Sequence, residues 1–247
     1  MDSANALTVF VAALLTALAT GLGALPLLFA GRADDRTLGL ANAIASGVMA
    51  AASVSLLLEA GDRDVPRTVV GTVLGVVFIV LVSTFLHAPH AAHTFGSLRG
   101  DDAIKALLIV GVMTVHSVAE GVGIGAAFGG GETLGLLIAL AIAVHNIPEG
   151  LAISLVLVPR GVSVRAAAGW SVFSSLPQPL LAVPAFLFVE AFAGVLPVAL
   201  GFAAGAMLWM VARELLPEAF ARAPTRQVLV ATGASFVAML TFQALLL

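Results

Sequence analysis

Long apolar stretches separated by short polar connections make up most of the 247 residues. A membrane-spanning helix needs about 20 consecutive apolar residues, and eight stretches approach or exceed this length. The sequence therefore predicts an all-α integral membrane protein, with eight transmembrane helices in a single domain over residues 1–247. The approximate bounds of the predicted spans are 6–28, 38–58, 68–86, 106–128, 133–158, 166–189, 192–216 and 228–247.

Composition agrees with a chain that lies in a lipid bilayer. Hydrophobic residues make up 60% of the sequence and charged residues 10%, with a mean hydropathy of +1.11, whereas a soluble domain carries about 25% charged residues. No nucleic-acid partner is expected. Because the chain contains no cysteine, a bound metal would need histidine, carboxylate, amide or water ligands.

The basic residues predict the orientation of the spans. Nine of them fall in or beside the connections that follow spans one, three, five and seven, and two fall on the opposite side. The positive-inside rule places the nine in the cytoplasm. This predicts that both termini are outside, that residues 87–105 form a cytoplasmic loop, and that the protein lies in the cell (inner or plasma) membrane. The nine are Arg32, Arg36, Arg99, Lys105, Arg160, Arg165, Arg213, Arg222 and Arg226, and the two are Arg63 and Arg67.

Two copies of one motif carry the candidate chemistry. Span four contains His116-x-x-x-Glu120-Gly121, and span five contains His145-x-x-x-Glu149-Gly150. On a helix, residues i and i+4 share one face, and ionisable groups inside a membrane usually mark a functional site. A single pair is equally well explained as a buried hydrogen bond without metal. Two pairs in consecutive spans favour a four-ligand metal site near the midplane, suited to Zn²⁺.

With these paired motifs, the chain resembles the ZIP family of divalent-metal transporters along essentially its whole length. The resemblance implies a ZIP-like bundle with spans four and five at its centre and a histidine-bearing cytoplasmic loop. It implies import of Zn²⁺ toward the cytoplasm by alternating access, with Cd²⁺, Fe²⁺ and Mn²⁺ as alternative ions, and it allows a homodimer. Neither enzymatic activity nor a cofactor other than the transported ion is expected.

Departures from the family pattern affect the expected number of metal ions. Ser117 stands where many bacterial members have Asn, and Gln178 in span six stands where related transporters often carry Glu. A centre with two metal ions would need the negative charge of that Glu and the side chain of that Asn. We therefore expect one metal ion, with Asn146, Ser117 and Gln178 as neutral neighbours of the four ligands.

Other polar residues are weaker candidates. His87, His90 and His93 follow span three, either as a loose cytoplasmic metal contact or as solvated loop residues. Glu59, Glu214 and Glu218 lie at the ends of spans two and seven, either as metal contacts along the pathway or as plain helix-end charges. The similar segments Leu56-Leu-Leu-Glu-Ala60 and Leu215-Leu-Pro-Glu-Ala219 end spans two and seven. This similarity is typical of an inverted repeat that relates spans one to three to spans six to eight.

Two other classes of protein stay open at this point. An intramembrane metalloenzyme would use a similar cluster, but the sequence lacks a His-Glu-x-x-His motif. A membrane metal sensor that does not transport would bind the ion without releasing it. The short connections leave no soluble output domain for signalling.

Overall fold

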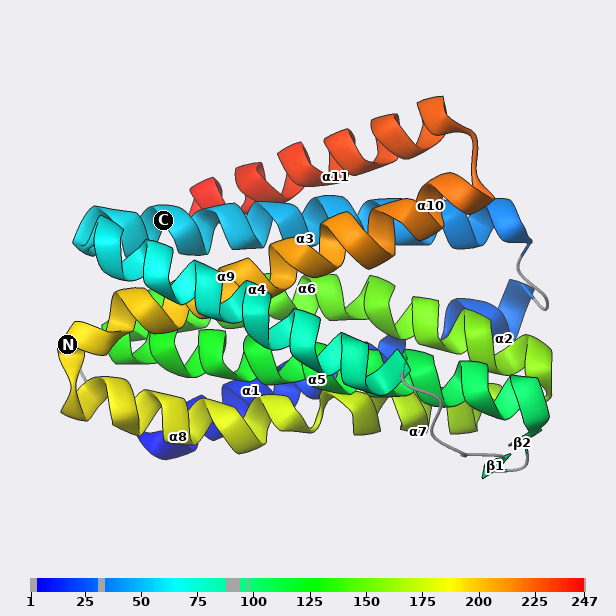
Figure 1. Cartoon of the computed structure of the whole chain (residues 1–247), viewed down its shortest axis with the longest axis horizontal. Coiled ribbons are helices and arrows are strands. Elements are labelled where there is room, and N and C mark those ends of the chain that lie inside the picture. Colours follow the sequence, from blue (N-terminus) through cyan, green and yellow to red (C-terminus); the bar gives the residue numbers. More distant parts are fainter. Residues whose placement is uncertain (1–3, 31–33, 88–93, 97, 247) are drawn as a thin grey trace.

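The computed structural model describes residues 4–30, 34–87, 94–96 and 98–246, and it is almost entirely helical. The helices run along one long axis, with both termini toward one end and a small hairpin at the other (Figure 1). The elements are α1 Ala6–Leu22, α2 Pro26–Ala30, α3 Asp35–Arg63, α4 Val65–His87, β1 Thr94–Phe95, β2 Leu98–Arg99, α5 Gly100–Gly130, α6 Glu132–Leu157, η1 Val158–Arg160, α7 Val164–Ser175, α8 Pro177–Ala191, η2 Ala193–Val195, α9 Leu196–Met210, the π-helical η3 Val211–Leu215, α10 Leu216–Arg222 and α11 Thr225–Leu246.

The described residues contain seven helical stretches that are long and apolar enough to cross a membrane. They are α1–α2, α3, α5, α6–η1, α7–α8, η2–α10 and α11, and α4 adds a shorter apolar segment over Val65–Leu81. Helix α5 begins at Gly100, so residues 100–105 of the predicted cytoplasmic loop are helical. The antiparallel hairpin of β1 and β2 lies in the same predicted loop. The chain is thus a multi-pass, all-α membrane bundle.

Polar caps and prolines set the ends of several helices. The side chain of Asn5 accepts a hydrogen bond from the backbone N–H of Thr8 at 2.9 Å, and Asp34 accepts one from Thr37 at 2.9 Å. Hydrogen bonds from the Thr37 side chain and backbone also hold the pKa of Asp34 below its usual range. Pro177 begins α8, where its missing N–H costs nothing, and this places Gln178 in the first turn.

Helices α5 and α6 pack against each other and lie between other helices on both sides. Helix α5 packs against α8 and α9, and α6 packs against α1 and α3. Outside this centre, α4 packs against α9, and α11 lies against α3 along one edge of the bundle (Figure 1). Helix α6 still has an exposed apolar face that includes Leu136, Leu140 and Val144, but the motif residues point into the protein, as ionisable groups inside a membrane require.

The packing has the symmetry that an inverted repeat requires. The exchange replaces α1 with α7–α8, α3 with α9–α10, α4 with α11, and α5 with α6. It turns the pair α5–α6 into itself and each of the other packed pairs into another packed pair. The similar segments at the ends of α3 and α10 correspond under this exchange. They lie at opposite ends of the bundle (Figure 1), as expected for halves of opposite orientation.

Candidate metal centre

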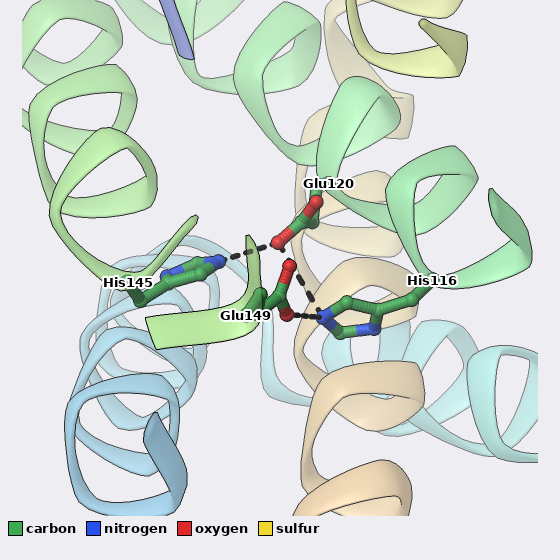
Figure 2. A group of neighbouring side chains, drawn as sticks. All are labelled: His116, Glu120, His145 and Glu149. Atoms are coloured by element: carbon green, nitrogen blue, oxygen red, sulfur yellow. Dashed lines mark hydrogen bonds and ion pairs between the residues drawn. The ribbon is translucent and has the colours of Figure 1, made fainter. Parts of the chain in front are cut away.

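Four buried side chains from α5 and α6 converge at the middle of the bundle. His116 and Glu120 come from α5, and His145 and Glu149 come from α6. Each helix presents its pair on one face because the two residues are four apart. The two carboxylates lie between the two imidazole rings (Figure 2). All four residues are at most 2% exposed, so the cluster is shielded from both membrane surfaces.

The ligand atoms of the cluster lie close enough together to share one ion. One ligand atom from each residue lies within 4.8 Å of the others. The Nε2 atom of His116 is 2.9 Å from Glu149 Oε1 and 3.4 Å from Glu120 Oε1, and His145 Nε2 also contacts Glu120 Oε1. Tetrahedral zinc with bonds of about 2.0–2.1 Å separates neighbouring ligand atoms by about 3.3 Å. The four side chains could therefore surround a small cation once the closest pair, His145 and Glu120, moves apart.

Hydrogen bonding leaves several of these atoms unsatisfied. His116 Nε2 and Glu149 Oε1 are close, yet neither has a hydrogen-bond partner with suitable geometry among the described residues. An unpaired buried polar atom costs free energy. Two carboxylates in a nonpolar interior also need compensating positive charge. One divalent cation would satisfy both requirements, since it accepts the free lone pairs and neutralises the two charges.

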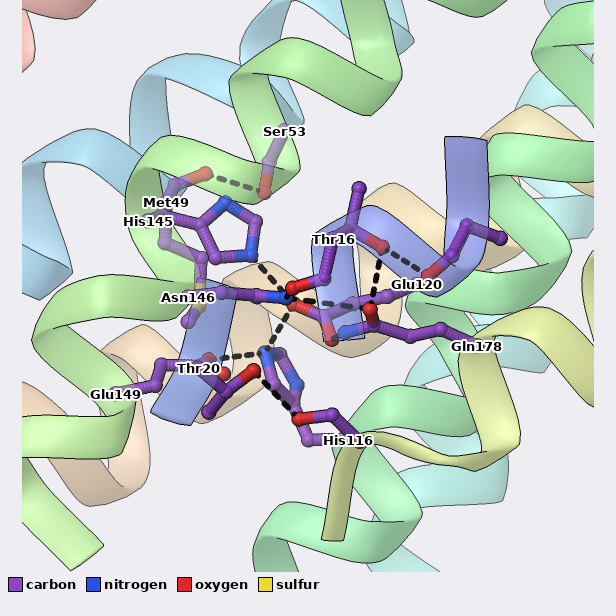
Figure 3. Close-up of polar contacts among 12 residues, drawn as sticks. Thr16, Thr20, Met49, Ser53, His116, Glu120, His145, Asn146, Glu149 and Gln178 are labelled. Atoms are coloured by element: carbon purple, nitrogen blue, oxygen red, sulfur yellow. Dashed lines mark hydrogen bonds and ion pairs between the residues drawn. The ribbon is translucent and has the colours of Figure 1, made fainter. Parts of the chain in front are cut away.

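The three neutral neighbours predicted from the sequence have different surroundings. Gln178 donates a hydrogen bond from Nε2 to Glu120 Oε2, and Asn146 Nδ2 donates to Gln178 Oε1 at 3.2 Å. Ser117 is buried on α5, and no hydrogen bond between it and the four candidate ligands is found in the described part of the chain. Thr16 of α1 also belongs to this group, because its hydroxyl donates to Gln178 Oε1 at 2.6 Å (Figure 3).

The other candidate residues lie apart from the cluster. Glu59 forms an ion pair with Arg63 at 2.7 Å, and Glu218 pairs with Arg222 at 2.5 Å. Glu214 lies in the π-helical turn η3. His87 ends α4, but its side chain lies outside the described residues, as do His90 and His93 altogether. The proposed histidine contact in that loop therefore stays a prediction.

A large vestibule leads from one end of the bundle toward the metal cluster. It has a volume of about 1240 Å³ and is lined by residues of α3, α4, α5, α6 and the α9–α10 segment, Glu214 and Glu218 among them. Lys105, Arg160 and Arg222 line it near the helix ends, and Met113 and Ala152 line it in the interior. On their helices, Met113 and Ala152 are about one turn from His116 and Glu149. The vestibule thus approaches the cluster from one side.

A multi-pass helical membrane bundle with a buried cluster of two histidines and two glutamates has the arrangement expected of a membrane metal-binding protein. Comparison with known proteins identifies it further. Residues 98–242, more than half of the chain, match the family model described as ZIP Zinc transporter. The chain belongs to the ZIP family, as the paired motifs predict.

Individual relatives agree with this family membership. Over 84% of the chain and 87% of its own length, the zinc transporter GufA of Myxococcus xanthus is 32% identical. The zinc transporter ZIPB of Bordetella bronchiseptica is 31% identical over 81% of the chain and 69% of its length. Arabidopsis thaliana At3g08650, a proposed zinc transporter, is 47% identical over 94% of the chain, which spans only 38% of that relative. Membership of this family supports transport of divalent metal ions.

Proposed function

We propose that this protein is a Zn²⁺ permease in which His116, Glu120, His145 and Glu149 bind the ion during transport. The observation that carries the proposal is the convergence of these four buried side chains within 4.8 Å of one another, on two central helices of a ZIP-family bundle. Nitrogen and oxygen ligands without thiolate suit Zn²⁺ and also accept Cd²⁺, Fe²⁺ or Mn²⁺.

The vestibule would serve as the release path for import toward the cytoplasm. It is lined by basic residues at the end of α5, in η1 and at the end of α10, among them Lys105, Arg160 and Arg222. By the positive-inside rule this end faces the cytoplasm. The termini then lie outside, and the protein belongs in the cell (inner or plasma) membrane. An ion leaving the cluster would pass Met113 and Ala152 and reach the cytoplasm through the vestibule.

Close glycine contacts divide the bundle into two groups of helices. A methyl group at Gly150 of α6 would lie 1.7 Å from the carbonyl oxygen of Thr20 in α1, and one at Gly125 of α5 would lie 2.1 Å from that of Ala182 in α8. In the other group, a methyl group at Gly75 of α4 would lie 2.0 Å from the carbonyl oxygen of Phe202 in α9. One at Gly47 of α3 would lie 2.0 Å from Ser235 Oγ in α11. Backbones that approach so closely are expected to move together.

Glycine contacts between the two groups are looser and reach side chains rather than backbone. The first group contains α1, α5, α6, α7 and α8. The second group contains α3, α4, α9, α10 and α11. At Gly123, where α5 faces α9 of the other group, a methyl group would meet only the side chain of Ala203, at 3.0 Å. All four candidate ligands belong to the first group. We propose that alternating access arises when this group carries the ion past the second group.

The histidines suit an ion that must be released. A histidine that ligates a resident metal almost always donates its second ring N–H to a protein group, which raises its basicity. In the described residues, the Nδ1 atoms of His116 and His145 have no such partner. A transporter must release the ion that it binds, so moderate affinity suits transport. A sensor that retains the ion would not need such a site. The alternative of an intramembrane metalloenzyme has no comparable support.

Uptake into proteoliposomes tests this function. Purified protein should take up Zn²⁺ or Cd²⁺ with saturation, and Glu149→Ala and His145→Ala should each abolish that uptake. Glu132→Ala is the matched control, because Glu132 begins the same helix but lies away from the cluster; its uptake should equal that of the wild type. Stoichiometric metal binding without uptake would favour the sensor, and unchanged uptake in both cluster variants would exclude this site.

A further inference from the structure

Three polar side chains from three helices meet on the side of Glu120 that faces away from the histidines. They are Thr16 of α1, Asn146 of α6 and Gln178 of α8, each at most 2% exposed. None is charged, and together they form a hydrogen-bonded chain that ends on Glu120 (Figure 3). We name this group of three residues the Gln178 clamp.

The donors of the clamp fix the orientation of the Gln178 amide. Its Oε1 atom accepts a hydrogen bond from Asn146 Nδ2 at 3.2 Å and lies 2.6 Å from the Thr16 hydroxyl. The single proton of that hydroxyl is shared between Gln178 Oε1 and the Ala13 carbonyl oxygen at 2.7 Å. Asn146 Nδ2 is itself oriented by the Thr16 carbonyl oxygen, to which it donates at 2.8 Å. A flipped Gln178 amide would point its NH₂ group at the NH₂ group of Asn146 and its oxygen at a carboxylate. The observed orientation is therefore strongly preferred.

This orientation assigns different tasks to the two oxygens of Glu120. Oε2 accepts the hydrogen bond from Gln178 Nε2. Oε1 lies next to both imidazoles, 3.4 Å from His116 Nε2 and in contact with His145 Nε2. A carboxylate with one oxygen held in this way offers the other oxygen to a metal ion. Glu120 is thereby set up to contribute one oxygen rather than two.

We propose that the Gln178 clamp holds Glu120 as a one-oxygen ligand and so favours Zn²⁺ over ions that prefer more oxygen ligands, such as Mn²⁺. This inference depends on the proposed function, since it concerns the same metal site. Zn²⁺ is satisfied by four ligands in a tetrahedral arrangement, whereas Mn²⁺ prefers six, mostly oxygen. Denying a second oxygen from Glu120 penalises the six-coordinate ion. Thr16, Asn146 and Gln178 are positioning residues in this scheme.

Co²⁺ binding to the purified full-length protein in detergent tests the proposal, because four-coordinate Co²⁺ absorbs visible light far more intensely than six-coordinate Co²⁺. The wild type should give the intense spectrum. Gln178→Met removes the amide but keeps a similar volume, and it should weaken the absorption per bound ion. It should also lower the preference for Zn²⁺ over Mn²⁺ in competition binding about 10-fold, the lower end of the effect of removing a group that orients a ligand.

Thr16 provides a milder pair of variants in case Gln178→Met fails to fold. Thr16→Val removes one donor to Gln178 Oε1 with almost no change in shape, and it should shift the spectrum and the ion preference in the same direction. Thr16→Ser keeps the hydroxyl and should behave like the wild type. A purely structural role for Thr16 would change thermal stability without changing the spectrum of bound Co²⁺.

The outcomes separate the clamp from the metal site itself. If wild-type protein binds no Co²⁺, or if His145→Ala binds it as the wild type does, the proposed site is wrong. If the wild type binds Co²⁺ with the weak six-coordinate spectrum, the clamp is overturned while the site stands. The clamp is also overturned if folded Gln178→Met and Thr16→Val both retain the wild-type spectrum and the wild-type preference for Zn²⁺ over Mn²⁺.

Discussion

Glu59 and Glu218 occupy equivalent residue positions in the two halves of the bundle but have different surroundings. Each is followed four residues later by an arginine to which it is paired, Arg63 at 2.7 Å and Arg222 at 2.5 Å. Only Glu218 lines the vestibule, where Arg222 also contacts Asp35 at 2.9 Å. Comparing variants of the two glutamates therefore tests whether a negative charge beside the proposed release path affects transport.

We predict that Glu218→Gln slows Zn²⁺ uptake while Glu59→Gln does not. Removing the Glu218 charge leaves Arg222 less neutralised, and the added positive potential in the vestibule repels the leaving cation. Because Glu218 is exposed to solvent, we expect a decrease of about threefold at low ionic strength that disappears near 1 M salt. Initial rates in proteoliposomes measure this effect. Equal rates for both variants at low salt would contradict a path past Glu218.

At the residue scale, spacing alone predicted the cluster but not the clamp. The four candidate ligands repeat one pattern in two consecutive spans, and a helix converts this pattern into a shared face. Gln178 was predicted as a neighbour of the ligands from the family resemblance, because it stands where related transporters often carry Glu. Thr16 was missed because a single threonine in an apolar helix gives no periodic signal, and its role depends on α1 packing against α6.

Among the helices, the tightest contact is the one between α1 and α6. Gly23 and Gly150 both lie in it, and a methyl group at Gly23 would come within 2.2 Å of the carbonyl oxygen of Ile147. Gly150 directly follows the candidate ligand Glu149. This close packing therefore fixes where α6 places its carboxylate, and any added volume there should disturb both stability and the metal site.

We predict that Gly150→Ala lowers the free energy of unfolding by about 1–3 kcal/mol, because overpacking forces the two backbones apart. The thermal unfolding midpoint of the detergent-solubilised protein and its Zn²⁺ uptake should both decrease. Gly169→Ala on α7 is the control, since a methyl group there meets nothing within 4 Å; it should stay within about 1 kcal/mol of the wild type. A wild-type midpoint for Gly150→Ala would contradict the contact between backbones.

At the element scale, the existence of the helices was easier to predict than their ends. Apolar length predicted eight spans. In the described residues, seven stretches are long and apolar enough to cross a membrane, and α4 is a shorter apolar helix. Polar residues that continue a helix beyond its apolar core carry no such signal. Helix α5 therefore begins at Gly100, inside the predicted loop, and α3 extends through Arg63, which pairs with Glu59. The π-helical turn η3 over Val211–Leu215 was likewise not predicted, since hydropathy does not encode the hydrogen-bond register.

For the whole molecule, the vestibule and the positive-inside rule lead to a single directional prediction. Because the chain has no cysteine, single-cysteine variants need no background removal. Ala152 lines the vestibule about one turn beyond Glu149, and Gly61 lies at the end of α3 with nothing within 4 Å of an added methyl group. In the proposed orientation, Ala152 is reached from the cytoplasm through the vestibule, whereas Gly61 lies toward the outer face of the membrane.

We predict that a membrane-impermeant maleimide labels Ala152→Cys from the cytoplasmic side, in inside-out vesicles, and labels Gly61→Cys from the outer side, in right-side-out vesicles. Label on Ala152→Cys should also block Zn²⁺ uptake, because it fills the release path, whereas label on Gly61→Cys should leave uptake unchanged. Reaction of Gly61→Cys from the cytoplasmic side would reverse the orientation. Reaction of Ala152→Cys from the outer side only would show that the vestibule opens to the outside. The vestibule would then be the entry path for import and not the release path.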